Sequence, residues 1–267
     1  MQGKIFAIAG SDPSGGAGVQ ADIKTISALG GYAMAAITAL TVQDSNKVYD
    51  VHPVPVDIVD AQVRIILKDI MPDAIKIGMM ASAETTQSLA RIFSDFGDIP
   101  LIIDPVIQSS SGHQLLEKRA VEILISDLLP RLALLTPNLA EAEILTGMSH
   151  LATPADMRRA GEKILSMGAA AVLVKGGHLP GNIVTDILVT EQGVHEFSSP
   201  KIQTRATHGT GCTLASAIAT GLAQGMPLKA AVGRAHKYVH EAIRQAPELG
   251  QSHRGGRGPL NHFVILD

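Results

Sequence analysis

The chain is poor in cysteine and in aromatic residues. It contains one cysteine and no tryptophan among 267 residues, and 3% of its residues are aromatic. One cysteine excludes a disulfide within the chain and is typical of proteins in a reducing compartment. The apolar run at the N-terminus is too short for a signal peptide or a membrane span. We therefore expect a cytoplasmic protein, and a chain of this size and composition is most often an enzyme.

The chain also lacks a strong excess of charge of either sign. Its 22 basic and 25 acidic residues give a formal net charge of −3, so no binding to nucleic acid or to an anionic membrane is expected. With 46% hydrophobic residues and few aromatics, the core must be aliphatic and rich in alanine, which suits helices packed on a parallel sheet. This length is close to the upper limit for one hydrophobic core, so we expect residues 1–267 to form a single domain.

Short apolar runs that predict strands alternate with segments of helical periodicity. We predict strands at 4–10, 32–42, 74–78, 101–104, 132–136 and 170–175, and a hairpin at 183–190 and 194–198. We predict helices at 19–29, 56–69, 84–96, 117–129, 139–146, 155–167, 210–224 and 228–244. This alternation indicates an α/β fold with a mostly parallel sheet, whose ligand crevice lies beyond the carboxyl ends of the strands. The residues that fall at those ends are Gly10, Gln43, Gly78, Asp104, Asn138 and Lys175.

The most informative segment runs from His208 to Cys212, contains Gly209 and Gly211, and opens a helix of small residues. Two glycines allow a tight turn and a close approach of the backbone to a ligand. The first turn of a helix has N–H groups without internal partners, and together with the helix dipole they form a site for an anion such as phosphate. Cys212 lies in this turn, where we expect its pKa to be lowered. The thiol could accept a proton from a hydroxyl, act as a nucleophile with His208 nearby, or be only a small buried side chain.

Four polar residues follow other strands. Asn138 and Glu141 are three residues apart on a predicted helix, and their oxygens suit magnesium or its waters, although the same pair could simply begin the helix. Asp104 could join them or could cap its strand. Lys175 could reach anionic oxygens as a mobile charge, or could be an ordinary surface lysine.

A glycine-rich loop from 9 to 18 follows the first predicted strand. Within it, Gly16, Gly18 and Ala21 match a dinucleotide fingerprint, which leaves a dinucleotide-dependent oxidoreductase as an alternative function. The match is weak, because the loop is long for that fold and no acidic residue clearly follows about 20 residues later. A Walker A sequence does not occur, so any nucleotide site must be built in another way.

Taken together, the motifs resemble the ribokinase-like superfamily, and most closely the hydroxymethylpyrimidine and phosphomethylpyrimidine kinases of thiamine biosynthesis. The segments that carry the resemblance are 9–22, 37–43, 76–79, 104–106, 135–141, 174–178 and 207–212. They span nearly the whole chain in order and are highly specific together, although some are shared with pyridoxal kinases. The resemblance implies a three-layer α/β/α sandwich.

The resemblance also implies an activity and a set of site residues. The expected reaction transfers the γ-phosphoryl group of ATP, with Mg²⁺, to 4-amino-5-hydroxymethyl-2-methylpyrimidine and then to its monophosphate. Gly209, Thr210, Gly211 and Cys212 would stabilise the transferring group, with Cys212 as the base and Lys175 bridging the phosphates. The implied substrate contacts are Gly10, Asp22, Gln43, Met79 and Val106; the nucleotide contacts are Asn138, Lys175, Gly209 and Gly211; and the metal ligands are Asp104, Asn138 and Glu141.

The chain departs from the family pattern at three places. Asp44 follows Gln43 where asparagine is common, Ser110 stands where relatives commonly have a lysine, and Ala206 replaces a frequent asparagine. If that lysine assists the second phosphorylation, this step is affected most. Pyridoxal kinase activity and a non-catalytic pyrimidine-binding module remain alternatives, and a homodimer is plausible.

Overall fold

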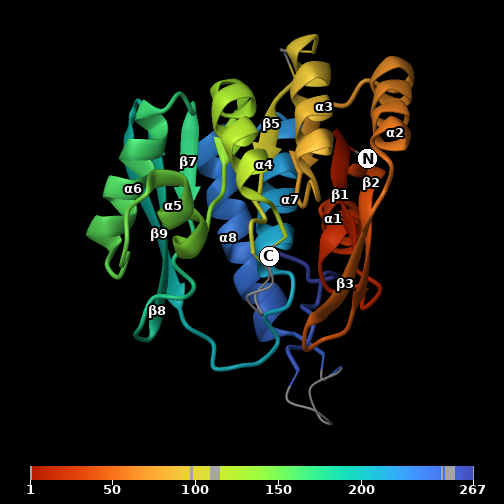
Figure 1. Ribbon diagram of the computed structural model, residues 1–267. Helices are drawn as coiled ribbons and strands as arrows, with labels where there is room; N and C mark the ends of the chain where they lie inside the picture. The colour runs from red at the N-terminus through yellow and green to blue at the C-terminus, as the bar shows by residue number, and fades with distance from the viewer. Residues whose placement is uncertain (1, 97–98, 109–114, 248, 250–255, 267) are drawn as a thin grey trace.

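A nine-stranded sheet forms the centre of the computed structural model, which describes residues 2–96, 99–108, 115–247, 249 and 256–266. Figure 1 shows the sheet with helices on both faces. The strand order is β3-β2-β1-β4-β5-β6-β7-β8-β9. The strands are β1 (Lys4–Ser11), β2 (Tyr32–Gln43), β3 (Val48–Pro53), β4 (Ala74–Ile77), β5 (Leu101–Ile103), β6 (Leu134–Leu135), β7 (Ala171–Val174), β8 (Ile183–Thr190) and β9 (Gly193–Pro200). Strands β2, β1, β4, β5, β6 and β7 are parallel, and β3, β8 and β9 pair antiparallel at the two edges.

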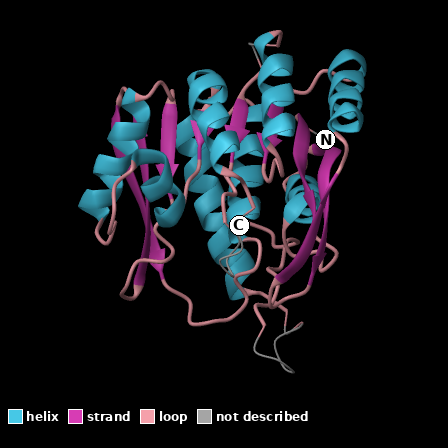
Figure 2. Cartoon of the chain, in the orientation of Figure 1, coloured by secondary structure: helices cyan, strands magenta, loops and turns pink. Residues whose placement is uncertain are grey.

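Helices cover both faces of the sheet, as Figure 2 also shows. The helices are α1 (Gly18–Ala28), α2 (Val56–Asp69), α3 (Ala83–Ser94), α4 (Lys118–Ile123), α5 (Leu139–Thr146), α6 (Pro154–Ser166), α7 (Thr210–Ala223) and α8 (Leu228–Arg244). Alternate residues of β1 point to opposite faces: Phe6 and Ile8 join the core under α2 to α6, whereas Ile5 and Ala7 join the core under α1, α7 and α8. The predicted three-layer α/β/α sandwich is therefore confirmed.

Helix α7 packs closely against the sheet because it is made of small residues. Ala215, Ala217 and Ala219 are completely buried on it. Gly209 precedes the helix with a φ of 86°, a conformation that favours glycine. The small side chains bring the start of α7 close to the carboxyl ends of the central strands, and this closeness positions the site.

Two local features differ from the sequence prediction. Strand β3 was not predicted, because Val48 is its only buried residue and an exposed edge strand lacks an apolar run. The helix predicted over 117–129 is regular only to Ile123; a π-helical turn and a 3-10 turn follow, up to Arg131. Pro130 lacks a backbone N–H, so the α-helical pattern cannot continue through it. No helix in the described part of the chain has the length and hydrophobicity that crossing a membrane requires.

Candidate active site

The polar residues predicted at the strand ends lie along one edge of the sheet. Gln43 is the last residue of β2, Asp104 directly follows β5, and Lys175 directly follows β7. Asn138 comes three residues after β6 and forms an isolated parallel bridge with Lys175. These residues thus lie at or just after the ends of strands in the parallel part of the sheet, the position where ligands bind in such folds.

The start of α7 meets Lys175 and Asp104. A Cβ added at Gly211 would lie 3.1 Å from both the Nζ atom of Lys175 and the Oδ2 atom of Asp104. Lys175 donates to the Oδ1 atom of Asp104 at 2.5 Å, and Asp104 is almost fully buried. Glu141 is close enough to interact electrostatically with both residues. The glycine turn, the lysine and the two carboxylates therefore converge on one small volume.

Asn138 and Glu141 form a reciprocal helix cap. The Oδ1 atom of Asn138 accepts from the N–H of Glu141 at 2.9 Å, and the Oε2 atom of Glu141 accepts from the N–H of Asn138 at 2.8 Å. Burial raises the pKa of Glu141 to about 7; the charge of Lys175 opposes this rise and that of Asp104 adds to it. The side-chain oxygen of Asn138 is thus part of the helix cap, which agrees with the alternative that this pair begins the helix.

The described residues contain no group of three or more acidic, histidine or cysteine side chains arranged to hold a metal ion. The carboxylates of Asp104 and Glu141 are the anionic oxygens at this place. Two carboxylates fit a magnesium ion that takes its other ligands from water and from substrate phosphates.

The prediction of a lowered pKa for Cys212 is wrong. Burial raises the pKa of this thiol to about 11, and the nearby carboxylates of Asp22 and Asp104 add to the rise. The charge of Lys76 and an N–H donated by Gly18 oppose it without offsetting it. The thiol is therefore protonated at neutral pH, because desolvation outweighs the helix terminus.

Asp22 is completely buried and is bound by side chains of the protein itself. Its carboxylate accepts from the Nζ atom of Lys76 at 2.8 and 2.9 Å and from Ser216 at 2.8 Å. Both members of this ion pair are completely buried, so the predicted contact of Asp22 with substrate is not possible in this arrangement. Lys76 received no role from the sequence, although a lysine within the apolar strand β4 signals a buried partner.

Gly10 and Met79, both predicted to contact the substrate, lie next to each other. A Cβ at Gly10 would lie 3.1 Å from the sulfur of Met79. Thr38 fixes Met79 by donating to its carbonyl at 2.6 Å. Val106 is half-buried in the segment after β5, where its N–H donates to the carbonyl of Asp104. Ser110 lies outside the described residues.

Asp12 and His208 connect the glycine-rich loop to the turn before α7. Asp12 accepts from the Nε2 atom of His208 at 2.8 Å and from the N–H groups of Ser14 and Ala17. Burial works against its charge, but these hydrogen bonds lower the pKa of Asp12 to about 2. His208 also lies 3.4 Å from Gln43, so it is committed to these neighbours and not to activating Cys212. Sequence spacing could not show the pair, because 196 positions separate its members.

The glycines of the dinucleotide fingerprint serve close packing within the chain. Gly16 contacts His208 and the backbone around Gly209, and Gly18 contacts the carbonyl of Gly10. A side chain at Gly16 or Gly18 would collide with these neighbours. This packing accounts for both glycines without a bound dinucleotide.

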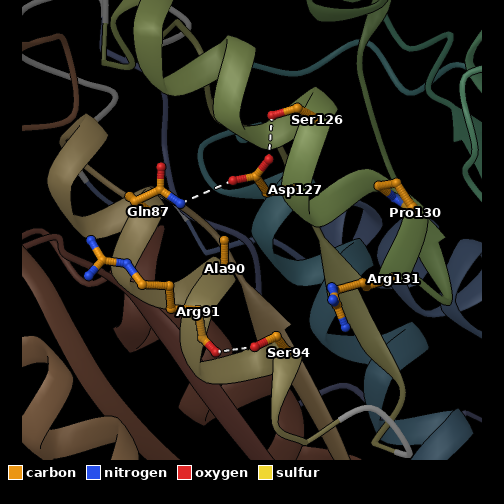
Figure 3. A pocket seen from close by; sticks show the side chains of 8 residues that line it. All are labelled: Gln87, Ala90, Arg91, Ser94, Ser126, Asp127, Pro130 and Arg131. Carbon is orange, nitrogen blue, oxygen red and sulfur yellow. Dashed lines mark hydrogen bonds between the residues drawn. The ribbon is translucent and has the colours of Figure 1, made fainter.

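A separate groove lies between α3 and the irregular turns after α4, away from these strand ends. Figure 3 shows Gln87 and Asp127 facing each other across it, joined by a hydrogen bond of 3.0 Å. Its lining contains none of the predicted site residues.

Comparisons with known proteins identify the family. The family model for phosphomethylpyrimidine kinase matches residues 12–257. The hydroxymethylpyrimidine/phosphomethylpyrimidine kinase of Rhizobium meliloti is 46% identical, over 98% of each chain. The thiamine biosynthesis bifunctional protein of Geobacter sulfurreducens is 43% identical to this chain over its full length. The match covers 53% of that longer protein.

Solved structures show the same fold. A Bacillus subtilis pyridoxal kinase in complex with ADP superposes with a TM-score of 0.89 at 33% identity, covering 98% of both chains. A phosphomethylpyrimidine kinase from Clostridium difficile gives a TM-score of 0.79 at 41% identity, covering 90% of this chain and 99% of its own. The chain therefore belongs to the phosphomethylpyrimidine kinase family, within the ribokinase-like kinases.

Proposed function

We propose that this protein transfers the γ-phosphoryl group of ATP to 4-amino-5-hydroxymethyl-2-methylpyrimidine and then to the resulting monophosphate, as a step of thiamine biosynthesis. The observation that carries this proposal is the close approach of the start of α7 to Lys175 and Asp104. A Cβ added at Gly211 would lie 3.1 Å from the Nζ atom of Lys175 and 3.1 Å from the Oδ2 atom of Asp104. Such an arrangement combines backbone donors, a cation and carboxylates around one volume. Phosphoryl transfer needs this positioning and charge stabilisation more than covalent help from the protein.

The residues around the glycine turn would handle the nucleotide and the transferring group. The N–H groups of Gly209, Thr210, Gly211 and Cys212 would point at the phosphoryl oxygens. Lys175 would bind the nucleotide phosphates, and Asn138 retains its side-chain NH₂ group as a further donor.

Asp104 and Glu141 would hold Mg²⁺ largely through water, and Asn138 would contribute by keeping Glu141 in place through the helix cap. When bound, the ion would supply positive charge to the phosphate oxygens. Burial, with a smaller contribution from Asp104, raises the pKa of Glu141, and a bound cation would favour its charged form.

The pyrimidine would lie between Gly10, Met79, Val106 and the carboxamide of Gln43. Gln43 offers a donor and an acceptor, which matches the edge of an aminopyrimidine. Cys212 would accept the hydroxyl proton during transfer. Because its pKa is about 11, it must first lose its own proton, so the reaction should become faster as the pH rises.

Pyridoxal kinase activity is the second candidate, because solved structures with that name superpose with TM-scores of up to 0.89. The test is a product assay with the pyrimidine and Mg-ATP that resolves monophosphate from diphosphate, together with kcat/KM for the pyrimidine, its phosphate and pyridoxal. Formation of both pyrimidine phosphates supports the proposal. A higher kcat/KM for pyridoxal would refute the substrate assignment.

Three broader properties belong to the same proposal. The apolar clusters on both faces share one sheet, which supports a single domain over 1–267. A cytoplasmic location suits an ATP-dependent enzyme with one cysteine. Leu40, Val42 and Tyr49 each expose about half of their surface on the β2–β3 hairpin, at 53%, 50% and 53%, which supports a homodimer through this hairpin. Light scattering after size-exclusion chromatography tests the dimer.

A further inference from the structure

The side-chain amide of Gln43 lies between two polar neighbours. Its Nε2 atom is placed 3.4 Å from the Nε2 atom of His208, and its Oε1 atom 3.3 Å from the Oγ1 atom of Thr41. The nitrogen and oxygen of an amide can exchange places by a half turn, so the correct orientation follows from which neighbours donate and which accept.

His208 must donate from Nε2. That atom lies 2.8 Å from the Oδ2 atom of Asp12, a buried carboxylate that is ionised above pH values of about 2, according to its lowered pKa. An ionised carboxylate only accepts hydrogen bonds, so the proton between the two atoms belongs to Nε2 of His208. A nitrogen that carries this proton cannot accept from the NH₂ group of Gln43. Two donors face each other.

The contacts of Thr41 also favour an amide orientation with the nitrogen of Gln43 toward Thr41. Its hydroxyl donates to the carbonyl of Ser11 at 2.9 Å. A hydroxyl has one proton, so toward Gln43 the Oγ1 atom can act only as an acceptor. It therefore needs the NH₂ group of the amide at the position where the Oε1 atom of Gln43 faces it.

We propose that the amide of Gln43 has its oxygen toward His208 and its nitrogen toward Thr41, and that Asp12 and His208 are positioning residues that fix this order. The half turn gives the hydroxyl of Thr41 the donor that it needs, and it removes the donor–donor contact with His208, whose single Nε2 proton stays with Asp12. It also decides which polar atom Gln43 presents at each side of the crevice. This inference rests on the proposed role of Gln43 at the pyrimidine edge.

The orientation has a consequence for substrate recognition. The edge of a 4-aminopyrimidine carries an amino donor beside a ring-nitrogen acceptor. The amino group then pairs with Oε1 on the His208 side, and the ring nitrogen pairs with Nε2 on the Thr41 side. A one-residue register shift between β2 and β3 occurs at Val42 and Gln43, and such irregularities often redirect a side chain toward a site.

The first test needs no substrate. In the ligand-free protein labelled with ¹⁵N-glutamine, nuclear Overhauser contacts from the Gln43 amide protons are measured to the Thr41 methyl group and to the His208 ring protons. We expect contacts predominantly to Thr41. Contacts predominantly to His208 would overturn the proposal. This measurement does not depend on activity. It therefore decides the orientation of the amide even if the proposed function is wrong.

The second test is kinetic. We expect His208→Ala to raise KM for the pyrimidine by up to about tenfold, because the amide of Gln43 loses the N–H group that disfavours its reversed orientation, while kcat and KM for ATP change less. His208→Gln retains an N–H donor and should restore part of the affinity. In a Gln43→Ala background, His208→Ala should add little, because its effect acts through the missing amide. His240→Ala, on α8, is the matched control and should behave as the parent.

Additive effects of His208→Ala and Gln43→Ala, or equal losses in kcat and in affinity for both substrates, would show a general structural role and overturn the proposal. If the parent forms no phosphorylated pyrimidine, the proposed function fails, while the resonance experiment still decides the orientation of the amide. If His208→Ala does not fold, His208→Gln and the resonance experiment keep the proposal testable.

Discussion

Gly211→Ala should separate stability from activity. The glycine is the second residue of α7, and its φ is not positive, so alanine can adopt its backbone conformation without strain. Alanine in a helix is favoured over glycine by about 0.5–1 kcal/mol. Against this gain, the new methyl group would lie 3.1 Å from Lys175 and Asp104, which must move by a few tenths of an ångström. We expect a net change in unfolding free energy within about 1 kcal/mol, or roughly 3 °C in Tm for a chain of this size.

The activity of Gly211→Ala should fall far more. The methyl group would occupy the space between the first turn of α7, Lys175 and Asp104, where the transferring phosphoryl group is proposed to lie. A displacement of about 1 Å of the reacting groups can cost about 100-fold in rate, and we expect a decrease of at least this size in kcat. KM for the pyrimidine should change little, because Gly10 and Met79 are not affected.

The assay is quantification of pyrimidine phosphates by chromatography at saturating Mg-ATP, with thermal unfolding measured on the same samples. Gly233→Ala is the matched control, since it introduces the same methyl group into helix α8 at an ordinary contact distance of 3.4 Å from Phe197. The control should have parental turnover. A folded Gly211→Ala protein with kcat within about twofold of the parent would refute the placement of the phosphoryl group, because the expected loss is about 100-fold.

Three further predictions concern the buried titratable groups. Cys212→Ala should lower kcat by ~10²–10⁴-fold with little change in pyrimidine affinity, and parental kcat should rise with pH because the thiol has a pKa of about 11; unchanged turnover or a flat profile contradicts its role as base. Lys76→Met should lower the unfolding free energy by about 3–5 kcal/mol in urea titrations, because Asp22 is left without its buried partner, and no loss would disprove this account. The pKa of Glu141 is raised from 4.5 to about 7, so its stabilising contribution is complete below about pH 4.5 and is lost as the pH rises through 7. Glu141→Gln should therefore gain about 1–3 kcal/mol over the parent between pH 4 and 8, and a constant difference across that range contradicts the shift.

The sequence predicted most of the fold because the apolar pattern is strong in its buried elements. The predicted bounds of α2, α5 and α8 agree with the structure, and the ends of β1, β4 and β7 differ by one residue. Helices on both faces of a parallel sheet leave its inner strands almost wholly apolar, which makes them easy to recognise. Strand β3 lies at an exposed edge, where a short alternating pattern carries little signal.

The sequence predicted which polar residues follow the strands, but it said less about their contacts and their pKa values. Strand ends placed Asp104, Asn138 and Lys175 correctly, because parallel strands finish at the same edge. A spacing of three fits both a metal pair and a helix cap, so the sequence could not decide between these for Asn138 and Glu141. The pKa of Cys212 is raised first by burial and then by carboxylates from distant elements, and no local sequence pattern reveals either cause.

Two ion pairs lie near the candidate site, and they differ in their exposure to solvent. Lys76 and Asp22 form the completely buried pair, so they can stabilise the packing of their elements but cannot exchange partners with a ligand. Lys175 and Asp104 form the second pair, beside Gly211, and 14% of the Lys175 side chain is exposed. Lysine is a mobile point charge on a flexible stem, so it can turn from a carboxylate to a phosphate over a short distance. The pairing of Lys175 with Asp104 thus compensates both charges before a nucleotide arrives, and it keeps the lysine next to the backbone donors with which it would act.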